Sequence, residues 1–237
     1  MNFNYFTENL LRWYTLNRRD LPWRETRNPY IIWLSEIILQ QTRVAQGLPY
    51  FHAFMNKFPT VEALANAPEE DILRTWQGLG YYSRARNLHA CARNIVIDRN
   101  GKFPDNYKGL LGLKGVGPYT AAAIASFAYR EQVAVVDGNV YRVLSRFFGL
   151  DADISSHHGK KAFGKLANEI IPEKTPDKYN QAIMEFGALQ CIPKNPNCQQ
   201  CPLRTGCHAL QNELVDKLPV NEKKVIVKSR YFLYYHI

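Results

Sequence analysis

The 237-residue sequence contains no apolar run that approaches the roughly eighteen residues needed to cross a bilayer. Its first residues also lack the pattern of a signal peptide, so we expect a soluble, cytosolic protein without a disulfide framework. A β-strand pattern is nearly absent before position 225, which disfavours folds built around a sheet. Because 46% of the residues are hydrophobic, the chain can form a core, in one large domain or two small ones.

Acidic residues are in the minority: 21 Asp and Glu stand against 30 Lys and Arg, which gives a formal net charge of +9. Basic and aromatic side chains are interleaved, as between Tyr81 and Arg86, instead of being gathered in a tail. This pattern suits a folded surface that contacts phosphates and stacks on bases. A basic, well-solvated enzyme surface is the alternative that composition leaves open.

Helical periodicity dominates the sequence and predicts an all-α fold. We expect helices over residues 3–17, 30–45, 47–56, 60–66, 69–76, 82–99, 106–112, 118–129, 138–148, 159–170 and 177–190. Residues 225–237 are instead rich in β-formers, and one strand alone has no partner. We therefore expect the chain to stop at the start of a second domain; a strand that docks on the helical body is the alternative.

Four cysteines lie within seventeen residues: Cys191, Cys198, Cys201 and Cys207, spaced C-x6-C-x2-C-x5-C. Thiolates held this close can enclose one metal centre, either tetrahedral zinc or an iron–sulfur cluster. Only Cys198 and Cys201 form the short hook typical of zinc sites, and the spacing alone does not separate the two metals. Cys91 stands apart and is expected to be a small buried residue.

Residues 111–124 contain a glycine-rich turn between two predicted helices, the second opened by Pro118. Gly115 and Gly117 leave the backbone bare on either side of Val116, so that N–H groups can point at a phosphate from the positive end of the next helix. This is the pattern of a helix-hairpin-helix, which holds one DNA backbone regardless of sequence. A plain glycine turn between packed helices is the alternative.

Residues 31–44 are mostly apolar, yet Glu36, Gln40 and Arg43 recur at i, i+4 and i+7 and would share one helical face. A carboxyl surrounded by hydrocarbon resists ionisation, so the pKa of Glu36 should rise toward the range that a general acid needs near neutral pH. An ion pair of Glu36 with Arg43 on a wet face is the alternative. Asp137 precedes a predicted helix, and local sequence alone favours an ordinary N-cap.

Five strings and the cysteine loop together resemble the endonuclease III superfamily of DNA glycosylases and, within it, the MutY-type adenine glycosylases. The strings are LPWR at 21–24, WLSEIILQQT at 33–42, GLGYYSRARNL at 78–88, LKGVGPYTAAAI at 113–124 and VVDGNVYRVLSR at 135–146. The resemblance reaches to about residue 215 and implies an all-α helix-hairpin-helix DNA glycosylase fold with a DNA cleft between two domains.

The implied domains are a six-helix barrel at 29–133 and an iron–sulfur cluster domain made of residues 1–28 and 134–215. Residues 216–237 would be a linker and the start of a truncated Nudix-like domain. By resemblance, the four cysteines hold a 4Fe–4S cluster, a structural element that orders a basic loop containing Lys194 and Arg204.

The resemblance also implies catalytic roles. Glu36 would protonate adenine at N7, and Asp137 would be the ionised carboxylate beside the oxocarbenium-like sugar. Tyr119 and Asn139 would orient that carboxylate or the catalytic water. Lyase-active relatives carry a lysine where this sequence has Tyr119, so we expect base removal without facile strand cleavage.

Substrate contacts follow in the same way from the resemblance. The adenine pocket would consist of Leu21, Trp23, Arg24 and Gln181. Gln41 and Tyr81 would wedge into the vacated base stack, and Gly115, Val116 and Gly117 would hold the DNA backbone.

The implied function is a monofunctional base-excision-repair enzyme that hydrolyses the N-glycosidic bond of adenine opposite 8-oxoguanine or guanine in double-stranded DNA, leaving an abasic site. We expect a cytoplasmic, nucleoid-associated monomer with no membrane partner. Without the rest of the second domain, discrimination of 8-oxoguanine:A from G:A should be blunted. Three alternatives remain: a glycosylase-lyase for oxidised pyrimidines, a non-catalytic iron–sulfur DNA-binding protein and a zinc-bound helical regulator.

Overall fold

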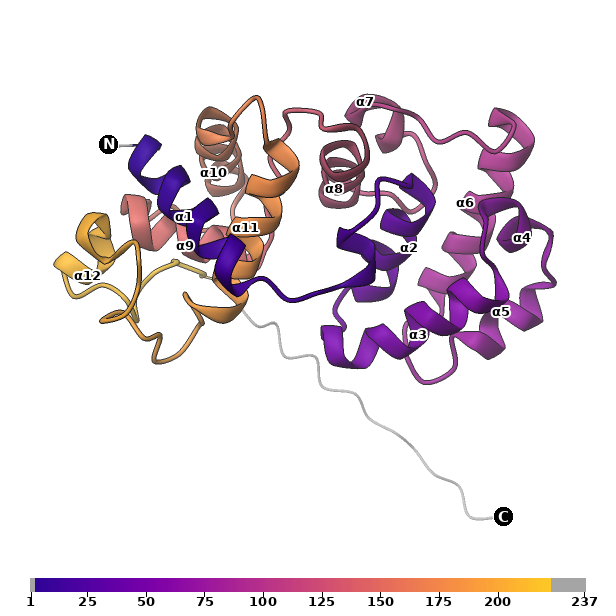
Figure 1. Cartoon of the computed structure of the whole chain (residues 1–237), viewed down its shortest axis with the longest axis horizontal. Helices are drawn as coiled ribbons and strands as arrows, with labels where there is room; N and C mark the ends of the chain where they lie inside the picture. Colours follow the sequence, from indigo (N-terminus) through magenta and orange to yellow (C-terminus); the bar gives the residue numbers. More distant parts are fainter. Residues whose placement is uncertain (1–2, 223–237) are drawn as a thin grey trace, which may run out of the picture.

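The computed structural model describes residues 3–222, and this range consists of helices joined by short loops, without a strand (Figure 1). In chain order the elements are α1 (Phe3–Asn17), η1 (Pro22–Arg24), α2 (Pro29–Leu39), α3 (Val44–Lys57), α4 (Val61–Asn66), α5 (Glu69–Thr75), α6 (Ser83–Arg99), α7 (Tyr107–Leu111), α8 (Pro118–Tyr129), α9 (Gly138–Phe148), α10 (His157–Ile170), α11 (Pro176–Leu189), η2 (Arg204–Gly206) and α12 (His208–Gln211). The all-α prediction is confirmed, whereas the strand expected over 225–237 lies outside the described residues. None of the helices between residues 3 and 222 is long and apolar enough to cross a bilayer.

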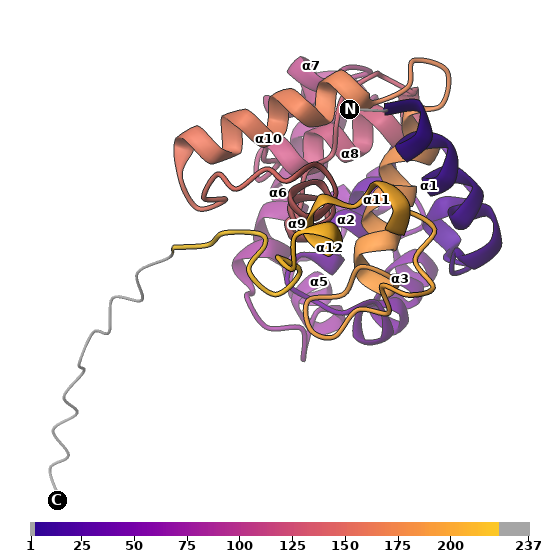
Figure 2. The same ribbon diagram turned by 90° about the vertical axis from the view of Figure 1, so that its left-hand side faces the viewer.

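The helices form two groups (Figure 1). Helices α2 to α8 lie together on one side. The first helix, α1, lies on the other side, where it packs against α11, next to α9, α10 and α12. Each group has its own core: Trp33 and Trp76 are buried in the first, Phe6 and Phe163 in the second. Seen from the side, α12 lies against α9 (Figure 2). The expected domain boundaries stay a prediction.

Most helices begin where the sequence places a capping residue or a proline. The side chains of Asn28, Thr60, Asn106 and Ser156 accept hydrogen bonds from the first turns of α2, α4, α7 and α10. Proline occupies the first turn of α2, α8 and α11, where its missing N–H leaves no bond unmade. These local signals explain why the predicted helix starts lie within a few residues of the observed ones.

The predicted helix over 30–45 is wrong in its second half. Helix α2 ends at Leu39, Gln41 has a positive φ of 56°, and α3 begins only at Val44. Arg43 therefore does not share a helical face with Glu36, and the alternative of a Glu36–Arg43 ion pair is also not observed in the described part of the chain. The break has a tertiary cause in Arg84.

Arg84 comes from α6 and caps the end of α2. Its guanidinium donates hydrogen bonds to the carbonyls of Ile37 (3.2 Å), Ile38 (3.3 Å) and Gln40. These carbonyls would otherwise need amide donors from a further helical turn. A cation at the negative end of the helix dipole stabilises the same termination.

The glycine-rich turn forms between α7 and α8 as predicted. Gly115 has a positive φ of 76°, and a Cβ there would approach the Asn87 Cβ to 3.1 Å. Glycine is required here for both reasons. Gly117 then stands directly before Pro118 at the start of α8.

Candidate active site

A cleft of about 560 Å3 lies where the two groups of helices meet. It is lined by side chains of α2 and α8 from one group and of α9 and α11 from the other. The cleft brings together residues that the sequence analysis assigned to catalysis and to base binding: Glu36, Asp137, Tyr119, Asn139, Leu21, Trp23, Arg24 and Gln181. Gln41 lies on it as well, whereas Tyr81, Gly115, Val116 and Gly117 lie elsewhere.

Glu36 is a buried carboxyl of the cleft that has few polar neighbours. It lies on α2 with 9% of its surface exposed, among the apolar side chains of that helix. Burial raises the pKa of Glu36 to about 7; hydrogen bonding with Tyr119 and the charge of Arg24 oppose the rise, and the charge of Asp137 adds to it. A substantial fraction of the Glu36 side chains is therefore protonated near neutral pH.

Asp137 is the N-cap of α9, as local sequence indicates. Its Oδ1 accepts from the backbone N–H of Val140 (2.8 Å), and its Oδ2 accepts from Asn139 Nδ2 (2.8 Å). Burial raises the pKa of Asp137, while these donors and the charge of Arg142 lower it. The two carboxyls thus differ in their surroundings: Asp137 has fixed donors that favour its ionised form, and Glu36 has mostly hydrocarbon.

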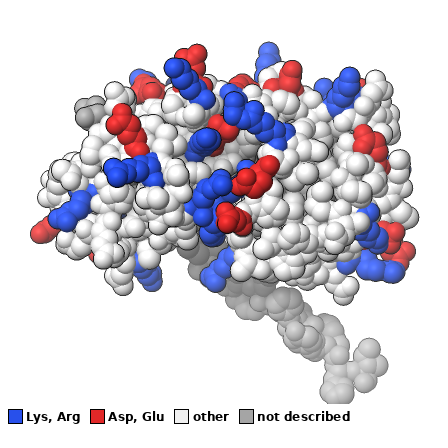
Figure 3. Space-filling view, viewed as in Figure 1, with Lys and Arg blue, Asp and Glu red and all other residues white. Residues whose placement is uncertain are grey.

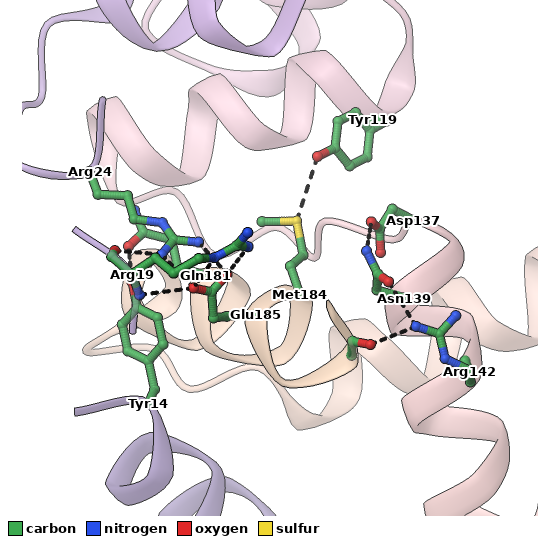
Figure 4. A network of polar contacts seen from close by, with 11 residues as sticks. Tyr14, Arg19, Arg24, Tyr119, Asp137, Asn139, Arg142, Gln181, Met184 and Glu185 are labelled. Atoms are coloured by element: carbon green, nitrogen blue, oxygen red, sulfur yellow. Dashed lines mark hydrogen bonds and ion pairs between the residues drawn. The ribbon is translucent and has the colours of Figure 1, made fainter. Parts of the chain in front are cut away.

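Asn139 connects Asp137 to the start of the cysteine loop (Figure 4). Its Oδ1 accepts from Arg142 Nη2 (2.8 Å), and the same guanidinium donates to the carbonyls of Gly187 (2.6 Å) and Cys191 (2.7 Å). Gly187 allows α11 to approach this closely, because a Cβ there would lie 2.6 Å from the Asn139 Cβ. The orientation of the Asp137 carboxylate is thereby fixed from α11 as well as from its own helix.

Tyr119 occupies the first turn of α8, on the opposite wall from Asn139. Its hydroxyl lies 3.5 Å from Met184 Sδ, and burial raises the pKa of Tyr119, so the hydroxyl stays protonated. Lys114 does not line the cleft; it lies with Gly115 at a small separate pocket beside Arg84. No lysine side chain in the described range lines the cleft.

Arg24 is held by Glu185, a residue that the sequence analysis missed. Glu185 is 1% exposed and accepts two hydrogen bonds from Arg24 (3.0 and 2.8 Å) and two from the Arg19 side chain (2.8 and 2.6 Å). Burial alone would raise the pKa of Glu185, but these donors outweigh it and bring the pKa to about 2. The only sequence signal is its position one helical turn after Gln181, which places both on the same face of α11.

The two predicted wedge residues lie on neighbouring loops that Arg84 connects. Gln41 and Tyr81 both have positive φ angles, 56° and 48°, and the Tyr81 side chain is 67% exposed. The Arg84 guanidinium lies 5.6 Å from the centre of the Tyr81 ring and binds the carbonyl of Gln40. Both residues therefore stand at backbone positions that α6 holds in place.

The four cysteines line a single apolar pocket together with Arg146, whose Nη1 lies 3.5 Å from Cys191 Sγ. Burial raises the pKa of the Cys201 thiol to about 12, and repulsion by the other three thiols adds to the rise, so the four are close enough to interact. Among residues 3–222, no three His, Cys, Asp or Glu side chains converge tightly enough to hold a single metal ion. A donor set of four soft thiols around one pocket fits a thiolate-bound cluster.

Comparison with known proteins places this geometry in a family. Residues 34–172 match the HhH-GPD superfamily of base excision DNA repair proteins. An adenine DNA glycosylase of Buchnera aphidicola (subsp. Baizongia pistaciae) is 38% identical over 96% of this chain and 65% of its own length; the human adenine DNA glycosylase is 43% identical over 87% of this chain and 39% of its own. The structure of a thermostable thymine-DNA glycosylase aligns with a TM-score of 0.82 and 32% identity over 89% of this chain and 97% of that one.

The chain belongs to the HhH-GPD superfamily of base excision DNA repair proteins. The expected family and the helix-hairpin-helix glycosylase fold are confirmed. The chain spans just under two thirds of the Buchnera relative and 39% of the human one.

Proposed function

We propose that this chain is a DNA glycosylase of base excision repair that removes adenine mispaired with 8-oxoguanine or guanine. The observation that carries the proposal is the pair of carboxyls in one cleft, Glu36 with its pKa raised to about 7 and Asp137 held by fixed donors. Relatives named adenine DNA glycosylase support adenine as the base.

Adenine is a poor leaving group as an anion and has to be protonated before it departs. The neutral Glu36 carboxyl gives its proton to N7, and the electrons of the C1′–N9 bond move onto the base, which leaves as neutral adenine. The sugar becomes an oxocarbenium cation, which the ionised Asp137 stabilises. Water adds to C1′, and the proton that it loses returns to a carboxylate, so that an abasic site remains.

Tyr119 and Asn139 serve this step by position. Asn139 donates to Asp137 and keeps it oriented, while the protonated Tyr119 hydroxyl interacts with Glu36 on the wall that α2 and α8 form. Because Tyr119 supplies no amine, no Schiff base with C1′ forms there, and the proposed reaction is monofunctional.

The adenine reaches the cleft only after it leaves the duplex, which costs a few kcal/mol of stacking and pairing. Leu21 and Trp23 are apolar walls for it, and Arg24 and Gln181 offer polar groups. We assign Gln41 and Tyr81 to the vacated stack and the turn Gly115–Val116–Gly117 to the DNA backbone. On the face seen in Figure 3 positive and negative side chains are intermixed, so the excess positive charge is not concentrated there.

Cys191, Cys198, Cys201 and Cys207 would hold a 4Fe–4S cluster. When bound, the cluster would hold the cysteine loop beside α9 and α11, and it would carry no step of the reaction. Lys194 and Arg204 lie on this loop, where they can reach phosphate. The same proposal includes the division into a barrel domain and a cluster domain. It also includes a monomeric state and a cytoplasmic, nucleoid-associated location.

The test is excision from a duplex with one 8-oxoguanine:A pair, scored as strand breaks before and after alkali. We expect alkali-dependent breaks at the adenine, and their loss in Glu36→Gln with duplex binding retained. Glu131→Gln is the matched control, because Glu131 does not line the cleft, accepts a hydrogen bond from the Tyr107 amide, and can be replaced by glutamine without loss of that bond. Breaks without alkali would indicate a lyase, and unchanged breaks in Glu36→Gln would refute the role of Glu36.

A further inference from the structure

Tyr14 joins α1 to the base-binding wall of the cleft. It is 5% exposed, and its hydroxyl donates to Gln181 Oε1 over 2.7 Å (Figure 4). The two residues are 167 positions apart in the chain, and no motif in the sequence connects them. Tyr14 does not itself line the cleft, whereas Gln181 does.

The structure gives the direction of this hydrogen bond: Tyr14 donates its hydroxyl proton, and Gln181 accepts it with its carbonyl oxygen. Burial raises the pKa of Tyr14, although the charges of Arg24 and Arg18 oppose the rise, so the hydroxyl keeps the proton that it donates. The NH2 group of the Gln181 amide, on Nε2, then remains without an acceptor in the described part of the chain.

The tyrosine ring is fixed independently of its hydroxyl. The Arg24 guanidinium lies 5.8 Å from the ring centre, and Arg24 is itself held by the two oxygens of Glu185. Removal of the hydroxyl alone would leave this packing in place, so the hydroxyl can be tested separately from the fold.

We propose that Tyr14 is a positioning residue for base recognition: it fixes the Gln181 amide so that its NH2 group faces the cleft and donates to an acceptor nitrogen of the extruded base. Adenine presents such acceptors on its ring edges, and the fixed amide rejects a base that presents a donor at the same place. This inference rests on the proposed glycosylase function.

A double-mutant cycle tests it. Single-turnover excision of adenine opposite 8-oxoguanine is measured for the wild type, Tyr14→Phe, Gln181→Ala and the double variant, together with duplex affinity and thermal stability. We expect Tyr14→Phe to lower the saturating excision rate about three- to tenfold, as for the loss of one net hydrogen bond, with duplex affinity unchanged. In the Gln181→Ala background the same change should have no further effect.

Tyr179→Phe is the matched control. Tyr179 is 2% exposed in the second core, and its hydroxyl has no partner in the described structure. Its removal should leave the excision rate unchanged. The inference alone would be overturned if Tyr14→Phe lowered the excision rate equally in the wild-type and Gln181→Ala backgrounds, or if it left the rate of an active protein unchanged. A wild type that releases no adenine would overturn the proposed function and this inference with it.

Discussion

Glu36 should make the protein less stable as the pH rises. Its carboxyl has a pKa of about 7 in the folded protein against an ordinary value of 4.5, so the folded state binds the proton more tightly than the unfolded state. The stability that this proton contributes is fully present below pH 4.5 and is lost as the pH rises through 7. Over the whole interval the loss is about 3 kcal/mol, and about 2 kcal/mol of it falls between pH 5.5 and 8.5.

Urea unfolding of the wild type and Glu36→Gln at these two pH values measures the effect, because glutamine does not titrate. The glutamine variant should gain about 2 kcal/mol relative to the wild type between pH 5.5 and 8.5. Glu131→Gln, which changes a carboxyl outside the cleft, should show no comparable gain. An equal difference between Glu36→Gln and the wild type at both pH values would refute the reasoning that burial keeps this carboxyl protonated.

Three further predictions concern the protonation of Glu36, the ion pairs of Glu185 and the hydrogen bonds of Arg84. The single-turnover excision rate should fall about tenfold per pH unit above pH 7, as Glu36 loses its proton; a flat pH–rate profile would contradict this. Glu185→Gln should lower the free energy of unfolding, measured in urea, by about 3 kcal/mol, because it removes the charge that compensates Arg19 and Arg24. A decrease below about 1 kcal/mol would show that solvent compensates the two guanidiniums. Arg84→Met should lower the free energy of unfolding by about 1–3 kcal/mol, because the carbonyls at the end of α2 lose their donors. It should also slow excision, because Gln41 and Tyr81 lose their common support. An unchanged excision rate would show that Arg84 does not support these two residues in their proposed role in the base stack.

The parts of the fold that were predicted from sequence have local causes. The ranges of α8 and α9 were obtained because Pro118 and Asp137 mark their starts and their apolar faces are continuous. The end of α2 was missed because the capping group, Arg84, comes from more than forty positions away.

The candidate site shows the same division. The catalytic and base-binding candidates that line the cleft were obtained from the family resemblance that the motifs carry, and the raised pKa of Glu36 was expected from its apolar neighbours. Glu185 and Tyr14 were not found, because each acts through contacts between α11 and the first 24 residues, which only the folded chain brings together. Their hydrogen bonds depend on tertiary geometry that no sequence spacing encodes.

The most direct test of the central claim is the identity of the base that the protein releases. Duplexes carrying adenine opposite 8-oxoguanine, thymine opposite guanine, and thymine glycol opposite adenine are incubated with the protein in single turnover, and the free bases are identified by mass spectrometry. Free adenine from the first duplex, with none in Glu36→Gln, is the predicted result. Release of thymine or thymine glycol in its place, or of no base from protein that binds the duplex, would contradict the assignment of an adenine glycosylase.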